Sequence, residues 1–581
     1  KRQVALALVG MLLFAGAGAS QPFLIGRAID TYIKDGDLQG VGYIGAALVG
    51  LAIIGWIGQY VQQITTAYMG HSVLRKLRTD MFDHIQKLSV SFLDRNQVGR
   101  VMSRVQNDVT VLQEILTSGL LLIMSEFAGL GLVIFFLLIM DVPLALITFT
   151  FVPILVVAMA IWQIRARLAF TRARQKIAVV NANLQENVSG VRVIQSLSRE
   201  DENMRRFDQV NADNWSANVE AGRLTAAVLP VVEVLMAAAT ALVIVFGGVR
   251  VLDGSLGFGI MVSFVLYVQR FFDPVRALVM QYTQLQRAMA GGQRIFELLD
   301  TKPEIVDAED AVRLPDVRGE VVFDHVGFEY VPGVPVLQDI NLHVRAGESL
   351  ALVGPTGAGK STLTALVARF YDVSEGSLRI DGIDIRQIER RSLACRMGIV
   401  LQDPFVFSGT VRENIRYGRL EASDDEVREA AGTVGAHQFI ERLPNGYDTV
   451  LQERGQNVSQ GQRQLIAFAR AVLADPRILI LDEATANVDT RTEVVIQKAL
   501  KRLLRGRTSF IIAHRLSTIR DADRVVVEQG RIAEEGSHAQ LLALDGIYAR
   551  LYRMTYEQTP AGSGDGRSPG SQLSPSSQPA G

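Results

Sequence analysis

The chain has 581 residues, of which 49% are hydrophobic and 20% are charged, so it is long enough for two or more domains. Its 59 Lys and Arg residues and 60 Asp and Glu residues give a net charge of -1. The chain therefore lacks the basic excess of a nucleic-acid-binding protein, and we expect no nucleic-acid partner. The single cysteine, Cys395, excludes an intrachain disulfide and any zinc or iron–sulfur site built from several cysteines.

Long hydrophobic runs dominate the first half of the chain. A helix that crosses the hydrocarbon core of a membrane needs about 20 apolar residues. Six runs carry at most one charged residue each and reach or approach this length: 3–26, 38–74, 115–140, 142–164, 224–249 and 254–269. Because five more runs follow the first, we expect the first to be a span and not a cleavable signal peptide. We predict an all-α membrane domain with six transmembrane helices over residues 1–300, embedded in a lipid bilayer.

Basic residues are concentrated in two connections between these runs. Connections 71–108 and 165–223 contain seven and ten Lys and Arg residues, whereas the other three connections contain three in total. Positive charge is enriched in cytoplasmic loops, so the two long connections are predicted to face the cytoplasm. Helical periodicity continues into them, as in Leu74, Leu77 and Met81, which predicts helical extensions reaching tens of ångströms beyond the membrane. Six helices that only anchor a soluble domain are disfavoured, since one span is enough for an anchor.

The second half of the chain has a different pattern. Residues 301–316 are polar and contain two prolines, which is typical of a linker. Over 317–555, short β-branched runs alternate with helical patterns, which predicts an α/β domain. Residues 556–581 are rich in Ser, Pro and Gly and are predicted to be disordered. The predicted fold is multidomain, with an all-α membrane domain followed by an α/β domain.

The strongest motif lies early in the α/β domain. The apolar strand 349–353 precedes Gly354-Pro-Thr-Gly-Ala-Gly359-Lys360-Ser361, and a helical pattern starts at Thr362. This is the phosphate loop GxxxxGK[ST] in its required strand–loop–helix context. Its backbone N–H groups can surround phosphates at a helix N-terminus, Lys360 can reach the β- and γ-phosphates, and Ser361 can hold Mg²⁺. We expect ATP and Mg²⁺ to bind here, with the nucleotide held by Gly354, Pro355, Thr356, Gly357, Ala358, Gly359, Lys360, Ser361 and Thr362.

Two later strands end in polar residues that suit the same chemistry. The run 478–481 ends in Asp482 and Glu483, and the run 508–512 ends just before His514. An Asp at the end of a strand beside a phosphate loop is suited to hold Mg²⁺. Glu483 can orient or deprotonate the attacking water. A lone histidine is most often structural, but its place after a strand favours a γ-phosphate contact for His514.

A third motif stands between the phosphate loop and Asp482. Ser459-Gln460-Gly461-Gln462 leads into a helical run. This segment resembles the LSGGQ signature of ATP-binding cassette (ABC) proteins, with Val458 and Gln460 in place of the usual Leu and first Gly. With six spans upstream, residues 1–555 are similar to half-transporters of the ABC exporter family, in which a membrane domain precedes the nucleotide-binding domain.

The resemblance implies roles for further residues. Tyr330 would stack on adenine, Gln402 would sense Mg²⁺ and the attacking water, and Asp489 would belong to a loop that senses the opposite site. Segments 91–104 and 185–190 would be intracellular loops, and 453–455 would face the membrane domain. By this resemblance, the catalytic residues would be Glu483, His514 and Gln402, and the Mg²⁺ ligands would be Ser361, Gln402 and Asp482. The nucleotide would be bound by Tyr330, the phosphate loop, Ser459, Gly461, Gln462 and Asp489.

The signature also has a physical rationale. Ser459 precedes a helix whose N-terminal end attracts phosphate, yet the ATP of this chain already has its own loop. The ATP of a second chain is the natural occupant, so two chains would sandwich two nucleotides, closing on ATP binding and separating after hydrolysis. The alternative is an ordinary N-capped helix.

These features together predict a transport-coupled ATPase. It would export amphipathic drugs, lipids or peptides across the plasma membrane, or move them between leaflets, with its cassette in the cytoplasm. A nucleotide-binding regulatory subunit or ATP-gated channel that does not pump is the rival function. Intact Lys360, Asp482, Glu483 and His514 argue against it, because a regulator could lose them. An importer is disfavoured because importers of this family generally carry membrane and cassette parts on separate chains.

Substrate and partner are less constrained. Glu126 and Glu233 lie inside predicted spans, where an unpaired carboxylate is costly. These two carboxylates could line a cavity for cationic cargo or could pair with a neighbouring span, and both alternatives are equally open.

All nucleotide motifs of this chain are intact, so a homodimer is possible. Gln460 would lie against the partner's ATP, where Gly allows closer approach. Because paired exporters often combine a complete chain with an impaired one, we favour a heterodimer with a second half-transporter.

Overall fold

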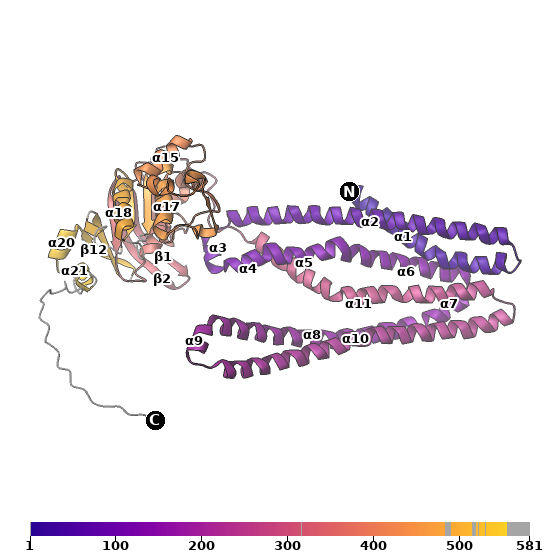
Figure 1. The fold of residues 1–581 in the computed structure, drawn as a ribbon. Coiled ribbons are helices and arrows are strands. Elements are labelled where there is room, and N and C mark those ends of the chain that lie inside the picture. The colour runs from indigo at the N-terminus through magenta and orange to yellow at the C-terminus, as the bar shows by residue number, and fades with distance from the viewer. Residues whose placement is uncertain are drawn as a thin grey trace, which may run out of the picture. The chain divides into compact units, whose positions relative to one another are not determined.

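The computed structural model describes residues 2–314, 316–482, 490–513, 519–520, 522–528 and 530–554. The chain divides into two compact units, one of residues 1–87 and 96–302 and one of residues 88–95 and 303–581. Figure 1 shows long helices in the first unit and sheets flanked by helices in the second. The predicted disordered tail, 556–581, lies outside the described residues.

The described part of the first unit consists of helices joined by short turns. Its α-helices are α1 (Arg2–Arg27), α2 (Leu38–Lys87), α4 (Val98–Ser103), α5 (Val109–Glu114), α6 (Leu120–Met140), α7 (Val142–Phe149), α8 (Phe151–Ser189), α9 (Val191–Ser196), α10 (Glu200–Leu252) and α11 (Phe258–Asp300). Three π-helical segments continue or join them: η1 (Ala28–Ile33), η2 (Arg104–Asp108) and η3 (Ile115–Gly119). The predicted extensions are present, since α2 has 50 residues and α10 has 53.

Five helices in the described part of the chain are long and apolar enough to cross a membrane. They are Arg2–Ile33, Leu38–Lys87, Ile123–Met140, Val142–Ser189 and Glu200–Leu252. The sixth predicted span falls largely within α11, and it stays a prediction. The multi-pass helical architecture itself is confirmed.

Close helix packing in this unit depends on small residues. A Cβ atom at Gly10 of α1 would lie 2.7 Å from the carbonyl oxygen of Gly58 in α2. A Cβ atom at Gly26 of α1 would lie 2.7 Å from the carbonyl oxygen of Gly259 in α11. Both approaches are closer than any side chain allows. Small residues at helix interfaces are the usual means of packing helices in lipid, where burial of apolar surface supplies little driving force.

The described residues of the second unit form three sheets. Its strands are β1 (Val321–Val331), β2 (Val334–Val344), β3 (Ser349–Val353), β4 (Glu375–Ile380), β5 (Ile383–Asp384), β6 (Met397–Val400), β7 (Gly409–Thr410), β8 (Val450–Leu451), β9 (Ile478–Asp482), β10 (Thr508–Ile512), β11 (Asp523–Glu528) and β12 (Arg531–Gly536). The strand orders are β2-β1-β4-β5, β12-β11-β3-β10-β9-β6 and β7-β8. In the six-stranded sheet all neighbours are parallel except β11 and β12.

Helices surround these sheets. They are α3 (Val90–Arg95), α12 (Lys360–Val367), α13 (Arg390–Ala394), α14 (Val411–Arg416), α15 (Asp424–Thr433), α16 (His437–Ile440), α17 (Gln460–Ala474), α18 (Thr490–Leu504), α20 (His538–Ala543) and α21 (Ile547–Tyr552), with 3-10 turns η4 (Ile385–Gln387), η5 (Gly446–Asp448) and η6 (Glu453–Gly455). One apolar core includes Phe323 and Phe510, and a second, which includes Ile466 and Phe468 of α17, packs under the helical part. The α/β fold predicted for this half is confirmed.

Candidate nucleotide-binding site

The central sheet brings the phosphate loop and the predicted magnesium ligand to one edge. Strand β10 lies between β3 and β9 and is parallel to both. Its Ile512 is in register with Leu352 on one side and with Asp482 on the other. The carboxyl ends of all three strands therefore coincide. Gly354, one residue after β3, and Asp482 are both located at this edge, as expected for a phosphate-binding crevice.

The phosphate loop needs its glycines for backbone conformation. Gly357 and Gly359 have φ values of 86° and 94°, in the left-handed region that favours glycine. Gly359 is also packed tightly, because a Cβ atom there would lie 2.6 Å from Cδ2 of Leu337. Helix α12 begins at the next residue, so its N-terminal N–H groups face the loop. This is the geometry of an anion-binding helix end.

Lys360 holds a positive charge against this loop. It is buried, and its Nζ atom donates to the carbonyl oxygens of Gly354 at 2.7 Å and Pro355 at 2.8 Å. Burial lowers the pKa of the Lys360 ammonium group from its usual value, and the nearby Asp482 carboxylate opposes that shift. A lysine and an aspartate thus share one edge of the sheet, which suits a nucleotide phosphate and its metal ion.

Tyr330, the predicted adenine-stacking residue, belongs to β1 and lies beside the first turn of α12. Its side chain is 38% exposed, and its hydroxyl forms a hydrogen bond of 3.1 Å with Oγ1 of Thr362. Its ring meets Phe328 and Tyr371 edge to face, with centroids 4.8 Å and 5.1 Å apart. We call Phe328, Tyr330 and Tyr371 the aromatic cluster. The sequence reasoning missed Tyr371, although an aromatic residue directly after the phosphate-loop helix was a usable signal.

The predicted signature forms a capping box. Oγ of Ser459 accepts a hydrogen bond from the backbone N–H of Gln462 at 3.3 Å, and Oε1 of Gln462 accepts one from the Ser459 N–H at 2.9 Å. These bonds satisfy two donors at the N-terminus of the 15-residue helix α17. The ordinary N-capped helix is therefore present in the structure. Ser459 is nevertheless exposed and Gly461 is buried, so the cap leaves the helix end open to a ligand.

An arginine of the same helix holds the segment that follows Gln402. Gln402 is exposed, three residues before Phe405. Nη1 of Arg470 donates to the carbonyl oxygen of Phe405 at 3.0 Å, and its Nε donates to the carbonyl oxygen of Asn414 at 2.9 Å. The guanidinium group also lies 5.7 Å from the centroid of the Phe407 ring. Arg470 was not predicted as a functional residue, although a charge within the apolar pattern of α17 is unusual.

Three predicted site residues are not part of this geometry. Glu483, Asp489 and His514 lie outside the described residues. Their predicted roles therefore rest on sequence alone.

The short helix α3 belongs to the same compact unit as the cassette, although it precedes it by more than 200 residues in the sequence. Oγ of Ser91 donates to Glu304 Oε2 at 2.6 Å, and Nη1 of Arg95 lies 2.9 Å from Glu304 Oε1. The hydroxyl of Tyr371 also donates to the carboxylate of Asp94. Ser91, Asp94 and Arg95, in the predicted first intracellular loop, thus bind Glu304 and Tyr371.

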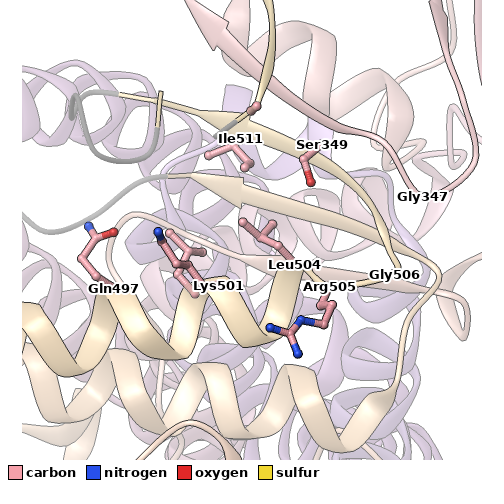
Figure 2. Close-up of a pocket in the computed structure, with 10 residues that line it drawn as sticks. Gly347, Ser349, Gln497, Lys501, Leu504, Arg505, Gly506 and Ile511 are labelled. Atoms are coloured by element: carbon pink, nitrogen blue, oxygen red, sulfur yellow. The ribbon is translucent and has the colours of Figure 1, made fainter. Parts of the chain in front are cut away.

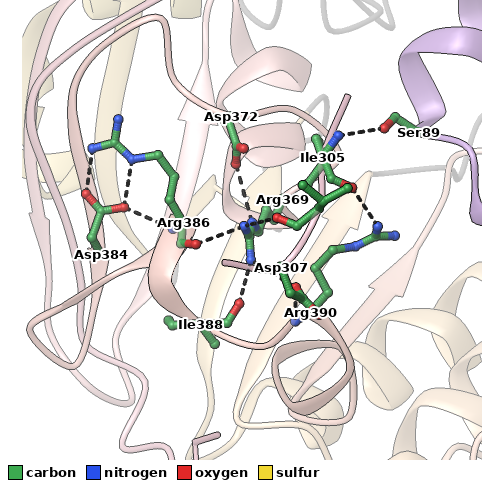
Figure 3. Close-up of polar contacts among 10 residues, drawn as sticks. Ser89, Ile305, Asp307, Arg369, Asp372, Asp384, Arg386, Ile388 and Arg390 are labelled. Atoms are coloured by element: carbon green, nitrogen blue, oxygen red, sulfur yellow. Dashed lines mark hydrogen bonds and ion pairs between the residues drawn. The ribbon is translucent and has the colours of Figure 1, made fainter. Parts of the chain in front are cut away.

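Arg369 secures the chain that enters the cassette (Figure 3). Its side chain is 2% exposed, and it donates to the carbonyl oxygens of Ile388 at 2.5 Å and Arg386 at 3.1 Å. It also lies 3.7 Å from an Asp307 oxygen. Arg369 follows α12 by two residues, so the phosphate-loop helix ends in a residue that binds the 305–307 segment. Oγ of Ser89 accepts a bond from the Ile305 N–H at 2.9 Å, which adds the start of the α3 region to this network.

A separate cavity of about 280 Å³ lies beside α18 (Figure 2). Lys501 and Arg505 line it, together with Ser349 at the start of β3. None of the described residues predicted for nucleotide binding lines it. This cavity is therefore distinct from the phosphate-loop site.

Comparisons with known proteins agree with this geometry. The family model for the ABC transporter transmembrane region matches residues 4–275, and the ABC transporter model matches residues 337–486. An uncharacterized ABC transporter ATP-binding protein of Bacillus subtilis (strain 168) is 40% identical over 561 residues, covering 96% of this chain and 93% of that protein. An ATP-dependent lipid A-core flippase of Syntrophus aciditrophicus (strain SB) is 37% identical over 564 residues, covering 97% of this chain and 94% of that one.

A solved structure is similar as well. A bacterial Atm1-family ABC exporter with ATP bound superposes with a TM-score of 0.79 and 31% sequence identity, covering 97% of this chain and 99% of the other. The resemblance inferred from the motifs is confirmed. This chain belongs to the ABC exporter family, as an ATP-hydrolysing half-transporter that fuses a helical membrane domain to an ATP-binding cassette.

Proposed function

We propose that this chain is half of a dimeric exporter that uses ATP to move lipids or other amphipathic molecules across a bilayer or between its leaflets. The observation that carries this proposal is the meeting of Lys360, the α12 N-terminus and Asp482 at one sheet edge. The helical membrane unit is fused to the cassette, so ATP hydrolysis can drive conformational change in it. A regulatory subunit or channel that does not pump would also bind nucleotide, but it could lose the residues proposed for hydrolysis, Glu483 and His514, which are both intact in this sequence.

The names of relatives support the substrate class. The 37% identical protein of Syntrophus aciditrophicus is named as a lipid A-core flippase. Amphipathic drugs and peptides stay open as cargo. We propose the plasma membrane as the location and the cytoplasm as the side that holds the cassette, because the basic connections 71–108 and 165–223 favour that orientation.

Magnesium fits the oxygen donors at the site. Mg²⁺ is usually held by one or two protein oxygen ligands together with substrate phosphates and water. Ser361 and Asp482 offer such oxygens at the loop and at the end of β9, and Gln402 is the third proposed ligand. When bound with ATP, Mg²⁺ neutralises charge on the β- and γ-phosphates. Residues Glu483 and His514 are proposed to orient the attacking water and to contact the γ-phosphate.

The partner chain is proposed to complete each site. Ser459, Gly461 and Gln462 would face the ATP held by the phosphate loop of the other chain, and Asp489 would sense that site. We favour a second, different half-transporter as the partner. We also propose domain limits of 1–300 for the membrane domain, 301–316 for the linker and 317–555 for the cassette.

Reconstitution tests the proposal directly. The purified chain, alone and with candidate partners, would be placed in liposomes that contain a fluorescent phospholipid in one leaflet. We expect ATP with Mg²⁺, but not a non-hydrolysable ATP analogue, to move the lipid to the other leaflet. ATP-dependent ion conductance without lipid or drug movement would instead favour the channel.

A further inference from the structure

One stripe of α18 lines the cavity of about 280 Å³ beside that helix (Figure 2). Gln497, Leu500, Lys501 and Leu504 belong to the helix, and Arg505 follows it directly. Residues three and four apart share one face of a helix, so these five side chains lie in a row. The row has polar groups at both ends and leucines between them.

The amide group at one end of the row is buried without a hydrogen-bond partner. The Nε2 atom of Gln497 is shielded from solvent and, among the residues that the structure describes, receives no acceptor. Figure 2 shows the Gln497 side chain projecting from α18 on the same side as that of Lys501. A buried donor left unpaired is costly, and nearly all such donors in proteins are satisfied by protein, water or ligand. This end of the cavity therefore favours a ligand that brings an acceptor.

The guanidinium group at the other end is also unengaged. Within the described part of the chain, Arg505 makes no hydrogen bond and no ion pair. Arg507, two residues further on, instead donates to the carbonyl oxygen of Pro476 at 3.1 Å and pairs with Asp475 at 2.8 Å. A guanidinium group is always charged, and its fork of N–H donors matches a carboxylate. Arg505 thus offers a site for one negative charge.

No described carboxylate lines the cavity. The two that are adjacent to its lining residues in sequence, Glu348 and Asp523, are hydrogen-bonded to each other. Burial raises the pKa of the Glu348 carboxyl group most, and the bond to Asp523 raises it further, against a bond from the Arg345 N–H that lowers it. This pair therefore binds a proton more readily than separate carboxylates would, which limits its repulsion of an anion.

The distance between the two ends determines the shape of the ligand. Gln497 and Arg505 are eight residues apart, which corresponds to about 12 Å along a helix. A single carboxylate is too small to contact both. Leu500 and Leu504 lie between them, and Ile511 of β10 lines the same cavity. Apolar surface of a ligand would be removed from water along this middle part.

We propose that this cavity binds a small, elongated organic monocarboxylate that carries a hydrogen-bond acceptor at the end opposite its carboxylate. The carboxylate would pair with Arg505, the apolar body would lie against the leucines, and the second acceptor would receive the Gln497 amide. The volume is slightly below the range of about 300–1,000 Å³ of sites for drug-sized ligands, so the ligand is small. A phosphate monoester fits less well, because it brings close to two negative charges and three acceptor oxygens to one guanidinium group. This inference concerns the cassette alone and goes beyond the proposed export function.

Equilibrium dialysis with radiolabelled para-acetylbenzoate tests the carboxylate end. The full-length chain in nanodiscs would be titrated without nucleotide, and empty nanodiscs would measure uptake by lipid. We expect Arg505→Gln to weaken binding about tenfold, which corresponds to about 1.4 kcal/mol. Arg505→Lys keeps the charge and should retain more of the affinity. The neutral methyl ester of the probe should bind the unmodified chain at least about tenfold more weakly than the acid.

Benzoate, which lacks the acetyl acceptor, tests the other end. Gln497→Leu should weaken para-acetylbenzoate about fivefold, within the range of one hydrogen bond, and should leave benzoate binding unchanged. The same variant should not lower the thermal unfolding temperature, because it removes a buried donor that has no partner. Equal losses for the two probes in Gln497→Leu would contradict the proposed orientation.

Lys498→Gln is the matched control. Lys498 is a basic residue of the same helix next to Gln497, but it is exposed and does not line the cavity. Its neutralisation should leave the affinity for both probes unchanged. Equal losses in Arg505→Gln and Lys498→Gln, unchanged affinity in Arg505→Gln, or no saturable binding beyond that of empty nanodiscs would each refute the site.

Lys360→Ala separates this cavity from the nucleotide site. Lys360 holds the phosphate loop and does not line the cavity, so its loss should leave para-acetylbenzoate binding unchanged. A loss as large as that in Arg505→Gln would place the probe at the phosphate loop and overturn the proposal. Because binding is measured without ATP, failure of the export proposal would leave this result unaffected.

Discussion

The hydroxyl group of Tyr371 donates a hydrogen bond to the carboxylate of Asp94, which lies 277 residues earlier in the chain. Burial, and then the hydrogen bond to Asp94, raise the pKa of the Tyr371 phenol, so the hydroxyl stays protonated at physiological pH and can donate. The Tyr371 ring also packs edge to face against Tyr330. One side chain therefore connects the proposed adenine platform with helix α3.

Replacing Tyr371 by Phe keeps the aromatic cluster but removes this hydrogen bond. A hydrogen bond of this kind contributes about 0.5–1.5 kcal/mol. We expect nucleotide affinity to be retained and the ratio of substrate-stimulated to basal ATPase to fall roughly two- to tenfold. Tyr417→Phe is the control, because among the described residues the Tyr417 hydroxyl makes no hydrogen bond. An unchanged stimulation ratio in Tyr371→Phe would show that the bond carries no coupling.

Two identical capping boxes allow the signature to be tested against its structural role. Ser537 and Gln540 form the same box at α20 as Ser459 and Gln462 form at α17. Loss of an N-cap costs about 1 kcal/mol, so Ser459→Ala and Ser537→Ala should lower thermal stability similarly. Only Ser459→Ala should also reduce ATPase, by roughly tenfold or more, since it removes a donor to a phosphate. Equal ATPase activity in the two variants would show that Ser459 acts only as an N-cap.

Substitutions of Lys360 and Glu483 should impair different steps of the ATPase cycle. Lys360→Ala removes charge-assisted bonds worth about 1.5–3 kcal/mol, so nucleotide binding should weaken by at least about tenfold. Glu483→Gln should keep ATP binding but lower turnover by roughly 10²–10⁴-fold, as expected for loss of a general base. Equilibrium ATP binding and steady-state ATPase on the same preparations distinguish the two. Full ATPase activity in Glu483→Gln that no partner chain supplies would show that Glu483 is not the catalytic base.

Local sequence patterns were sufficient to predict the phosphate loop and the strands that carry it and Asp482. The strand 349–353 followed by glycines and Lys360 predicts its own strand–loop–helix, and parallel strands bring Asp482 to the same edge. The apolar runs likewise predict membrane helices. Such inferences succeed because the relevant residues are close in sequence or follow a fixed helical or strand period.

Long-range pairs could not be predicted in this way. The Tyr371–Asp94 bond and the contacts of Arg470 with Phe405 depend on how distant segments fold together. The cavity lined by both Glu126 and Arg270 has the same origin, because the two residues belong to different helices, α6 and α11, and only packing brings them together. Single residues of these types occur throughout the chain, and no spacing marks the ones that meet.

Arg470 should be needed for both stability and turnover. Lysine cannot reproduce the bonds of Arg470 to the carbonyl oxygens of Phe405 and Asn414, so these two acceptors would lose a partner. We expect Arg470→Lys to destabilise the cassette by about 2–4 kcal/mol and to lower ATPase by loosening the segment after Gln402. Scanning fluorimetry of the full chain measures the first effect. Arg428→Lys is the control, because Arg428 is on the surface of α15 and its ion pair with Asp425 is 3.9 Å long.

The identity of the second chain is the last test. Gln460 is the first residue of α17, so it would lie against the ATP of the partner chain, where a glycine would allow closer approach. A partner whose own catalytic residues are impaired would leave Glu483 and His514 of this chain to hydrolyse ATP. We therefore expect this chain, expressed alone, to be monomeric or nearly inactive in detergent, and a second half-transporter to restore ATPase. Size-exclusion chromatography with light scattering and ATPase assays measure both. A stable homodimer with full ATPase activity would contradict the heterodimer proposal, because a signature with Gln460 would then support ATP hydrolysis at both sites.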